Sequence, residues 1–205
     1  MHPNRTILKG FCGASLYPAV VSVRTAEAGT GVRSVTGVTS EGPRADYFPN
    51  VDFMDQDGRK IKFYDDIIRG RLVVINMMYT ACTGICPPNT ANLLQVQQAL
   101  GPRIGRDVHM VSISLHPEFD SPATLKAYAK KYDIQPGWTF LSGKRGDMES
   151  VRRKLGFYDK DPFEDAKLAR HTGMLRIGNE RIDRWCMVPS LSPTRQIVKS
   201  ILDMV

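Results

Sequence analysis

Two cysteines separated by three residues are the part of this sequence whose types and spacing point most directly to chemistry. The segment 79–88 reads YTACTGICPP, so Cys82 and Cys86 flank a short turn that contains Gly84. Glycine permits a tight turn, which would bring the two sulfurs together. Such a pair can close a disulfide, or it can present two thiolates to one soft metal ion such as Cu(I).

The position of Cys86 in the sequence is expected to stabilise its thiolate form. Pro87 and Pro88 suit the first turn of a helix, so Cys86 would lie just before a helix amino terminus. Free N–H groups and the helix dipole favour an anion there, and we therefore expect a lowered pKa for the Cys86 thiol. A thiolate serves both metal binding and thiol–disulfide exchange, so this feature leaves both open.

The elements on either side of the pair are predicted from their apolar patterns. Residues 72–79 (LVVINMMY) form a nearly continuous apolar run, typical of a central strand buried on both faces. After the turn, Leu93, Val96 and Leu100 recur at helical spacing. The pair is therefore expected on a strand-to-helix turn, with Met77 and Met78 packed in the core although thioethers can bind Cu(I).

The remaining pattern predicts an α/β, thioredoxin-like fold, with a mixed central sheet flanked by helices and a β-hairpin at the start of the domain. Asp57-Gly58 and Gly178-Asn179 are expected hairpin turns. Besides the strand and helix at the cysteines, the predicted elements are strands 51–54, 60–63, 108–115, 138–141, 173–177 and 181–187, and helices 121–132, 148–155 and 193–204.

The first 46 residues lack the pattern of a domain. A basic start and a modest apolar stretch over residues 10–23 precede the AEA triplet at 26–28, which matches a signal-peptidase site. We expect residues 1–28 to be a signal peptide or N-terminal anchor, 29–46 a flexible linker and 47–205 the domain. Export to the periplasm or cell envelope follows from this interpretation, and a disordered tail is the alternative.

Composition narrows the function classes. The 205 residues are 42% hydrophobic and 24% charged, a globular balance, and no stretch approaches the roughly 20 apolar residues of a membrane span. The net charge of +7 is spread along the chain without a nucleic-acid motif, so no nucleic-acid role is expected. A mildly basic surface suits an acidic partner or an anionic membrane surface, and membrane association through the N-terminus is left open.

The other cysteines do not suggest a disulfide-stapled scaffold. Cys12 falls in the predicted signal segment, and its removal leaves three cysteines, an odd number. Cys186 follows Trp185 in a predicted strand and is expected to be a core thiol, with a mixed disulfide as the alternative.

Over about residues 47–205 the chain resembles the Sco/SenC family. The likeness rests on Cys82-x-x-x-Cys86-Pro87, on SISLHPEFDSP at residues 112–122, and on Arg170-His171-Thr172 before the late hairpin. Members of that family are thioredoxin-fold copper chaperones of cytochrome oxidase assembly. Their copper ligands are the two cysteines of the CxxxC motif and one late histidine. By position, the resemblance implies copper, as Cu(I) or Cu(II), on Cys82, Cys86 and His171.

The expected place of His171 in the fold supports this assignment. The segment before the late hairpin lies next to the cysteine turn in a thioredoxin fold, where an oxidoreductase carries a cis-proline. This sequence has His171-Thr172-Gly173 instead, which puts a potential ligand in place of a substrate clamp. An imidazole beside two thiolates gives a three-coordinate site that suits both oxidation states of copper.

His116 departs from the family pattern, which commonly has aspartate there. It could be a fourth ligand, a group that orients another ligand through a hydrogen bond, or a tolerated change, and we favour the last two.

The leading hypothesis is a copper chaperone that delivers copper to an apo-cuproenzyme, and the resemblance implies the binuclear copper centre of cytochrome oxidase subunit II as acceptor. The alternative is a thiol–disulfide oxidoreductase in which Cys82 attacks and Cys86 resolves. It would reduce the acceptor's cysteines or sense redox state, served by a thioredoxin-like reductant. A peroxidase is less favoured because Tyr79, not threonine, stands three residues before Cys82. An interaction module without chemistry is the remaining alternative.

Overall fold

The computed structural model describes residues 40–205, except for the side chain of Ala169. The expected signal segment 1–28, with Cys12, and most of the expected linker lie outside the described residues. The last part of that linker contacts the domain. The Asn50 amide donates to Ser40 Oγ at 2.8 Å, and Arg44 forms an ion pair with Asp183.

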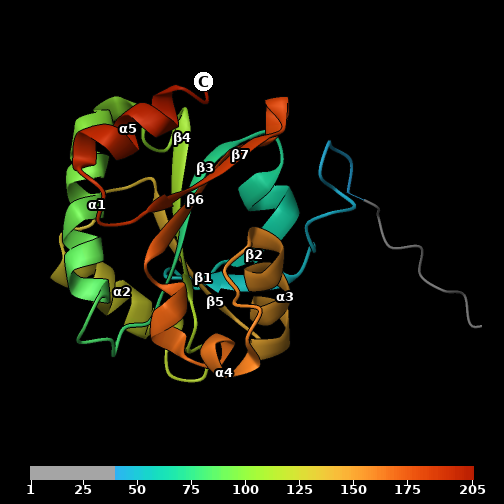
Figure 1. Ribbon diagram of the computed structural model, residues 1–205, viewed down its shortest axis with the longest axis vertical. Coiled ribbons are helices and arrows are strands. Elements are labelled where there is room, and N and C mark those ends of the chain that lie inside the picture. The colour runs from blue at the N-terminus through green and yellow to red at the C-terminus, as the bar shows by residue number, and fades with distance from the viewer. Residues whose placement is uncertain (1–39) are drawn as a thin grey trace, which may run out of the picture. The chain divides into compact units, whose positions relative to one another are not determined.

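A seven-stranded mixed sheet organises the domain (Figure 1). Its strands are β1 (Asp52–Asp55), β2 (Lys60–Lys62), β3 (Leu72–Met78), β4 (Val108–Ser114), β5 (Trp138–Gly143), β6 (Met174–Asn179) and β7 (Arg184–Pro189). They lie in the order β2-β1-β5-β4-β3-β6-β7. The strands β5, β4 and β3 are mutually parallel, whereas β6 runs antiparallel to β3.

Helices cover both faces of this sheet (Figure 1). One face carries α1 (Cys86–Leu100), α2 (Pro122–Lys131) and α5 (Thr194–Leu202). The other carries the π-helical segment η1 (Phe63–Ile68) and α3 (Arg145–Leu155). Shorter helical turns are η2 (Gly101–Arg103), α4 (Pro162–Asp165), η3 (Leu168–His171) and η4 (Glu180–Ile182). The expected α/β fold with a mixed sheet, flanking helices and a β-hairpin at the start is confirmed.

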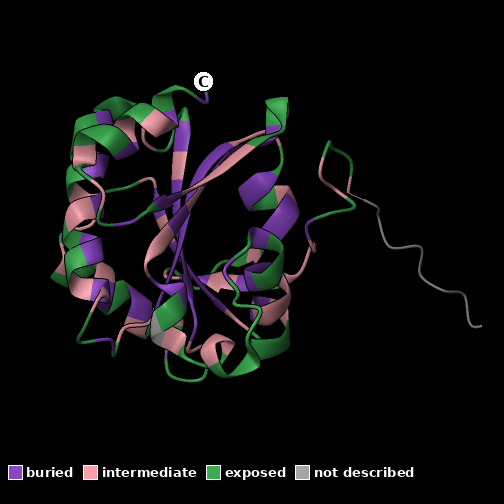
Figure 2. Cartoon of the chain, in the orientation of Figure 1, coloured by how far each residue is buried: buried purple, intermediate pink, exposed green. Residues whose placement is uncertain are grey.

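Strand β3 carries the chain through the middle of the molecule to the cysteines. All seven of its residues are buried, because it has β4 and β6 as neighbours and helices on both faces (Figure 2). Val74 and Met78 pack against α1, while Ile75 and Met77 face the core beneath α3. Both methionines are therefore core residues, as expected.

The late hairpin has a different turn from the expected one. Gly178 and Asn179 belong to β6, and the connection to β7 is made by η4 and by Asp183, whose φ is 49°. A Cβ added at Gly178 would lie 2.0 Å from Cε3 of Trp185. Glycine is needed here because an aromatic ring lies against the strand, not because the chain turns.

The segment between α3 and β6 contains two short helices, α4 and η3, that the apolar pattern did not predict. Asp161 caps α4 by accepting a hydrogen bond from the Phe163 N–H at 2.9 Å. Four-residue helices are too short to show a period, so specific side-chain contacts must fix this segment. It ends at His171.

Candidate metal centre

The cysteine turn joins the end of β3 to the first residue of α1. Cys86 is that first residue, and its backbone N–H donates to Cys82 Sγ at 3.4 Å. The Cys82 N–H donates to the Tyr79 carbonyl at 3.2 Å, which closes the turn. Both thiols are free and buried, with Cys82 9% and Cys86 2% exposed. The expected strand-to-helix turn is confirmed, and it brings the two sulfurs together.

The two thiols differ in acidity, in the order opposite to the expected one. Burial raises the pKa of the Cys86 thiol to about 12, and the neighbouring Cys82 adds to this rise. Burial also opposes ionisation of Cys82, but hydrogen bonds from the Cys86 thiol, the Cys86 N–H and the Tyr79 hydroxyl together lower its pKa. The expected low pKa of Cys86 is wrong, because its thiol is buried and the N–H at this helix terminus donates to the sulfur of Cys82 instead.

Tyr79 connects Cys82 with His116. The hydrogen bond of the Tyr79 hydroxyl to Cys82, together with burial, raises the pKa of Tyr79 to about 12. The ring of His116 lies edge-on to that of Tyr79, with 6.0 Å between the ring centroids. The ring centroids of His116 and Phe119 are 4.5 Å apart. His116 thus approaches the cysteine pair through a tyrosine, and its role there stays a prediction.

Asp120 anchors the start of the cysteine turn, and sequence reasoning missed it. Its buried carboxylate accepts hydrogen bonds from the Thr80 N–H at 3.2 Å, from the Thr80 hydroxyl, and from Ser114 Oγ at 2.6 Å. Thr80 and Asp120 are 40 positions apart. Only the parallel pairing of β3 with β4, which places the ends of both strands at one edge of the sheet, could have predicted this contact.

The segment before β6 packs against the cysteine turn, as the fold prediction required. The side chain of Thr172 hydrogen-bonds to Cys86, and its carbonyl accepts from Asn89 Nδ2 at 2.6 Å. A Cβ added at Gly173 would lie 3.6 Å from Cδ1 of Ile85 in the turn. The residue directly after His171 therefore contacts the cysteine pair.

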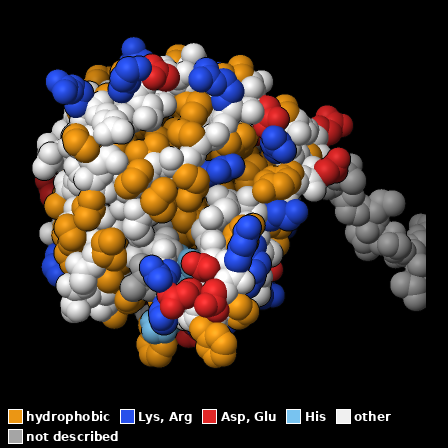
Figure 3. Space-filling view, in the orientation of Figure 1, with side chains coloured by type: hydrophobic (Ala, Val, Ile, Leu, Met, Phe, Trp, Pro, Cys, Tyr) orange, Lys and Arg blue, Asp and Glu red, His pale blue; other side chains and the backbone are white. Residues whose placement is uncertain are grey.

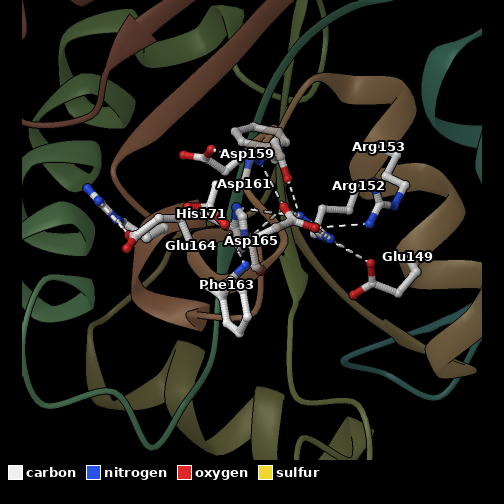
Figure 4. Close-up of polar contacts among 11 residues, drawn as sticks. Glu149, Arg152, Arg153, Asp159, Asp161, Phe163, Glu164, Asp165 and His171 are labelled. Carbon is white, nitrogen blue, oxygen red and sulfur yellow. Dashed lines mark hydrogen bonds and ion pairs between the residues drawn. The ribbon is translucent and has the colours of Figure 1, made fainter.

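The imidazole of His171 itself does not join the cysteines. It is 4% exposed, and its Nε2 lies 2.7 Å from the Asp165 carbonyl oxygen and 3.2 Å from Nη1 of Arg152. Figure 4 shows the ring beside Asp165, which lies in the same segment as His171, and beside Arg152, which lies on helix α3. Within residues 40–205, no three histidine, cysteine or carboxylate side chains come together as a metal site. The structure brings Cys82 and Cys86 together, and the ligand role of His171 stays a prediction.

Cys186 lies apart from this pair. It is in β7 opposite Ile177, half-buried against the core, and burial raises the pKa of its thiol. As for membrane insertion, the part of the chain from residue 40 onward contains no helix with the length and apolarity of a bilayer span.

Comparisons with known proteins now identify the family. A family model described as SCO1/SenC matches residues 40–205. A SCO1 protein homolog of Bacillus subtilis is 34% identical over 92 residues, which cover 44% of this chain and 46% of the homolog, so the chain spans about half the length of that relative.

Two solved structures show the same fold. A SCO1/SenC family lipoprotein from Bacillus anthracis aligns with a TM-score of 0.62 and 23% identity, covering 77% of this chain and 94% of the other. ScoI of Bradyrhizobium japonicum, solved with copper bound, aligns with a TM-score of 0.58 and 23% identity, covering 75% of this chain and 96% of that one. The thioredoxin-like arrangement is thereby confirmed, and with the match of the family model over residues 40–205 the chain belongs to the SCO1/SenC family.

Proposed function

We propose that this protein is a copper chaperone that holds one copper ion between Cys82, Cys86 and His171. The observation that carries the proposal is the cysteine turn. Two free thiols face each other on one strand-to-helix turn, and Thr172, the neighbour of His171, contacts one of them. Two thiolates suit Cu(I), and an added imidazole extends the site to Cu(II).

Two of the three proposed copper ligands, the Cys82 and Cys86 sulfurs, are already placed to share one ion. The Cys82 and Cys86 sulfurs already lie on the same turn, and a structural relative was solved with copper bound. His171 would have to leave Asp165 and Arg152 before a ring nitrogen could reach the thiols. Copper is cargo in this proposal, and the protein's part is to bind it, shield it from water and release it.

The acceptor we propose is the binuclear copper centre in subunit II of cytochrome c oxidase. One structural relative is described as a member of a family of cytochrome c oxidase assembly proteins. Transfer would run through shared-ligand intermediates, in which each thiolate is replaced in turn by a ligand of the acceptor. Export to the cell envelope, with residues 1–28 as signal or anchor, belongs to the same proposal.

The unequal acidity of the two thiols supports a second function, thiol–disulfide exchange. The Cys82 thiol, whose pKa is lowered, would attack a disulfide of the partner, and Cys86 would then resolve the mixed disulfide. Two electrons and two protons pass from the pair to the partner, which leaves Cys82 and Cys86 as a disulfide. Reducing the acceptor's cysteines before copper arrives would join the two functions in one protein.

The test is a copper titration of the full chain in its reduced and oxidised forms, with metal counting and absorption spectra. We expect about one copper per chain for the reduced form only. Cys82→Ser and Cys86→Ser should lose tight binding, and His171→Ala should lose the Cu(II) spectrum. Full copper stoichiometry in either serine variant would contradict the chaperone proposal. Disulfide reductase activity that survives in His171→Ala would favour the second function.

A further inference from the structure

A buried ion pair fixes the segment that carries His171 to helix α3. Arg152 of α3 is 3% exposed, and its guanidinium donates to both carboxylate oxygens of Asp165, each at 2.8 Å. It also donates to Glu149 at 2.7 Å and to the Phe157 carbonyl at 2.6 Å. Figure 4 shows Arg152 reaching from α3 into this segment, and in Figure 3 charged side chains of both signs gather in the lower part of the view, where α4 lies.

The same two residues hold the imidazole of His171. Nε2 lies 2.7 Å from the Asp165 carbonyl oxygen, so Nε2 carries the ring proton and donates it there. Nδ1 then keeps its lone pair, and Nη1 of Arg152 lies 3.5 Å from Nδ1 and 3.2 Å from Nε2. A copper ion requires a ring nitrogen with a free lone pair, and a guanidinium beside the ring repels a second cation. In this arrangement the Asp165 carbonyl occupies Nε2, and the buried guanidinium opposes a second cation at Nδ1.

The residue after His171 already lies at the cysteine pair. Thr172 already contacts Cys86 through its side chain, and its carbonyl is held by Asn89 of α1. The backbone next to His171 is therefore anchored at the cysteine pair, while the side chain of His171 is anchored on α3. Freeing the ring requires the loss of its contacts with the Asp165 carbonyl and with Arg152, at the end of a short 3₁₀ turn.

We propose that Arg152 is the positioning residue for His171. With Asp165 it forms a latch that holds the imidazole away from the cysteine pair, and three-coordinate copper binding requires this latch to release the ring. The proposal rests on the proposed function, in which His171 is a copper ligand. The two thiolates bind Cu(I) without the latch opening, whereas Cu(II), which depends on the imidazole, binds only as the latch opens.

The experiment weakens the latch while keeping its charges or its shape. Arg152→Lys retains the positive charge but loses the two-pronged contact with Asp165, and Asp165→Asn retains the shape of the carboxylate. In the full-length reduced protein, the readout is the rate at which the thiolate-to-Cu(II) absorption band appears. We expect this rate to rise roughly three- to tenfold in either variant, the order of change for a lost charge-assisted hydrogen bond. Two-thiolate Cu(I) binding should change by less than about twofold.

Two controls separate the latch from general loosening of the fold. Arg59→Lys alters another ion pair with a buried carboxylate, that of Asp55, in the hairpin between β1 and β2, and it should leave the Cu(II) rate unchanged. In a His171→Ala background, Arg152→Lys should have no effect on copper binding. Thermal unfolding of each variant checks that the native state is populated, and Asp165→Asn keeps the test valid should Arg152→Lys fail to fold.

The outcomes distinguish the two proposals. A Cu(II) rate that stays the same or falls in folded Arg152→Lys and Asp165→Asn, while His171→Ala loses the Cu(II) band, overturns the latch and leaves the chaperone function standing. A Cu(II) band that is unchanged in His171→Ala overturns the ligand assignment, and the latch with it. A Cu(I) affinity that changes when Arg152→Lys is added to His171→Ala also overturns the latch, because the effect would not pass through the imidazole.

Discussion

The two parts of the proposed copper site are held in place by different means. The cysteine turn is held mainly by backbone: the end of a buried strand, the start of a fifteen-residue helix, and the N–H of Cys86 on the sulfur of Cys82. Asp120 adds a side-chain anchor at Thr80. The segment of His171 consists of two four-residue helical turns, and side-chain ion pairs from Arg152 fix it to α3. Backbone geometry persists as long as the fold does, whereas side-chain contacts can be exchanged within a folded molecule. In the proposed site the sulfur donors are thus prearranged, and the nitrogen donor is adjustable.

The largest expected effect tests the anchoring of the histidine segment. In Arg152→Ala the buried carboxylate of Asp165 loses its main partner, and removing one member of a buried ion pair costs about 3–5 kcal/mol of unfolding free energy. Urea unfolding followed by circular dichroism measures this. A loss below about 1 kcal/mol would show that other contacts hold the segment. It would contradict the statement that the Arg152 side chain fixes the His171 segment to α3.

The second prediction concerns the acidity of the two thiols. The pKa of Cys82 lies below its ordinary value and that of Cys86 near 12, so raising the pH ionises Cys82 first. At neutral pH the thiolate fraction of Cys82 should therefore exceed that of Cys86. Alkylation with iodoacetamide between pH 6 and pH 10, read out by peptide mass spectrometry, should modify Cys82 alone. Equal modification of both would remove the asymmetry on which the exchange function depends.

A third prediction compares the donors directly. Cys86→Ser should lower the affinity for Cu(I) by about a hundredfold or more, if the binding free energy is shared among ligands as in structural zinc sites. His171→Ala should lower it by less than about tenfold, because two thiolates suffice for Cu(I). Competition with a chromophoric Cu(I) chelator gives both values. Equal losses would mean that the imidazole is a full ligand from the outset.

The smallest expected effect tests the anchor of the cysteine turn. Asp120→Asn keeps the shape of the side chain but weakens the hydrogen bonds from Thr80 and Ser114, at a cost of about 1–3 kcal/mol in unfolding free energy. Because α1 and β3 still fix the cysteines, copper stoichiometry should not change. Metal counting on the variant checks this, and a loss of bound copper would show that the positions of the two sulfurs depend on this side-chain anchor as well as on the backbone.

The sequence predicts the prearranged part of the site much better than the adjustable part. A continuous apolar run, a glycine and two prolines are enough to place Cys82 and Cys86 on a strand-to-helix turn, because these are local features of the chain. The orientation of His171 depends on Arg152, 19 positions away, and on Asp165, and neither shows a period or motif. Gly178 was likewise predicted to form a turn. Its actual role is to make room for the ring of Trp185, and this contact can be recognised only once β6 and β7 are paired.

The burial of the His171 imidazole between Asp165 and Arg152 has a consequence that can be stated in populations. A ligand that is free only part of the time lowers the apparent affinity of its site by the fraction of molecules in which it is free. If one molecule in about a hundred had the ring released, Cu(II) would bind about a hundredfold more weakly than to the assembled site. Any partner that competes for Arg152 or Asp165 would shift that fraction. In the proposed site, copper affinity would then respond to contacts on α3 or α4, at residues that never touch the metal.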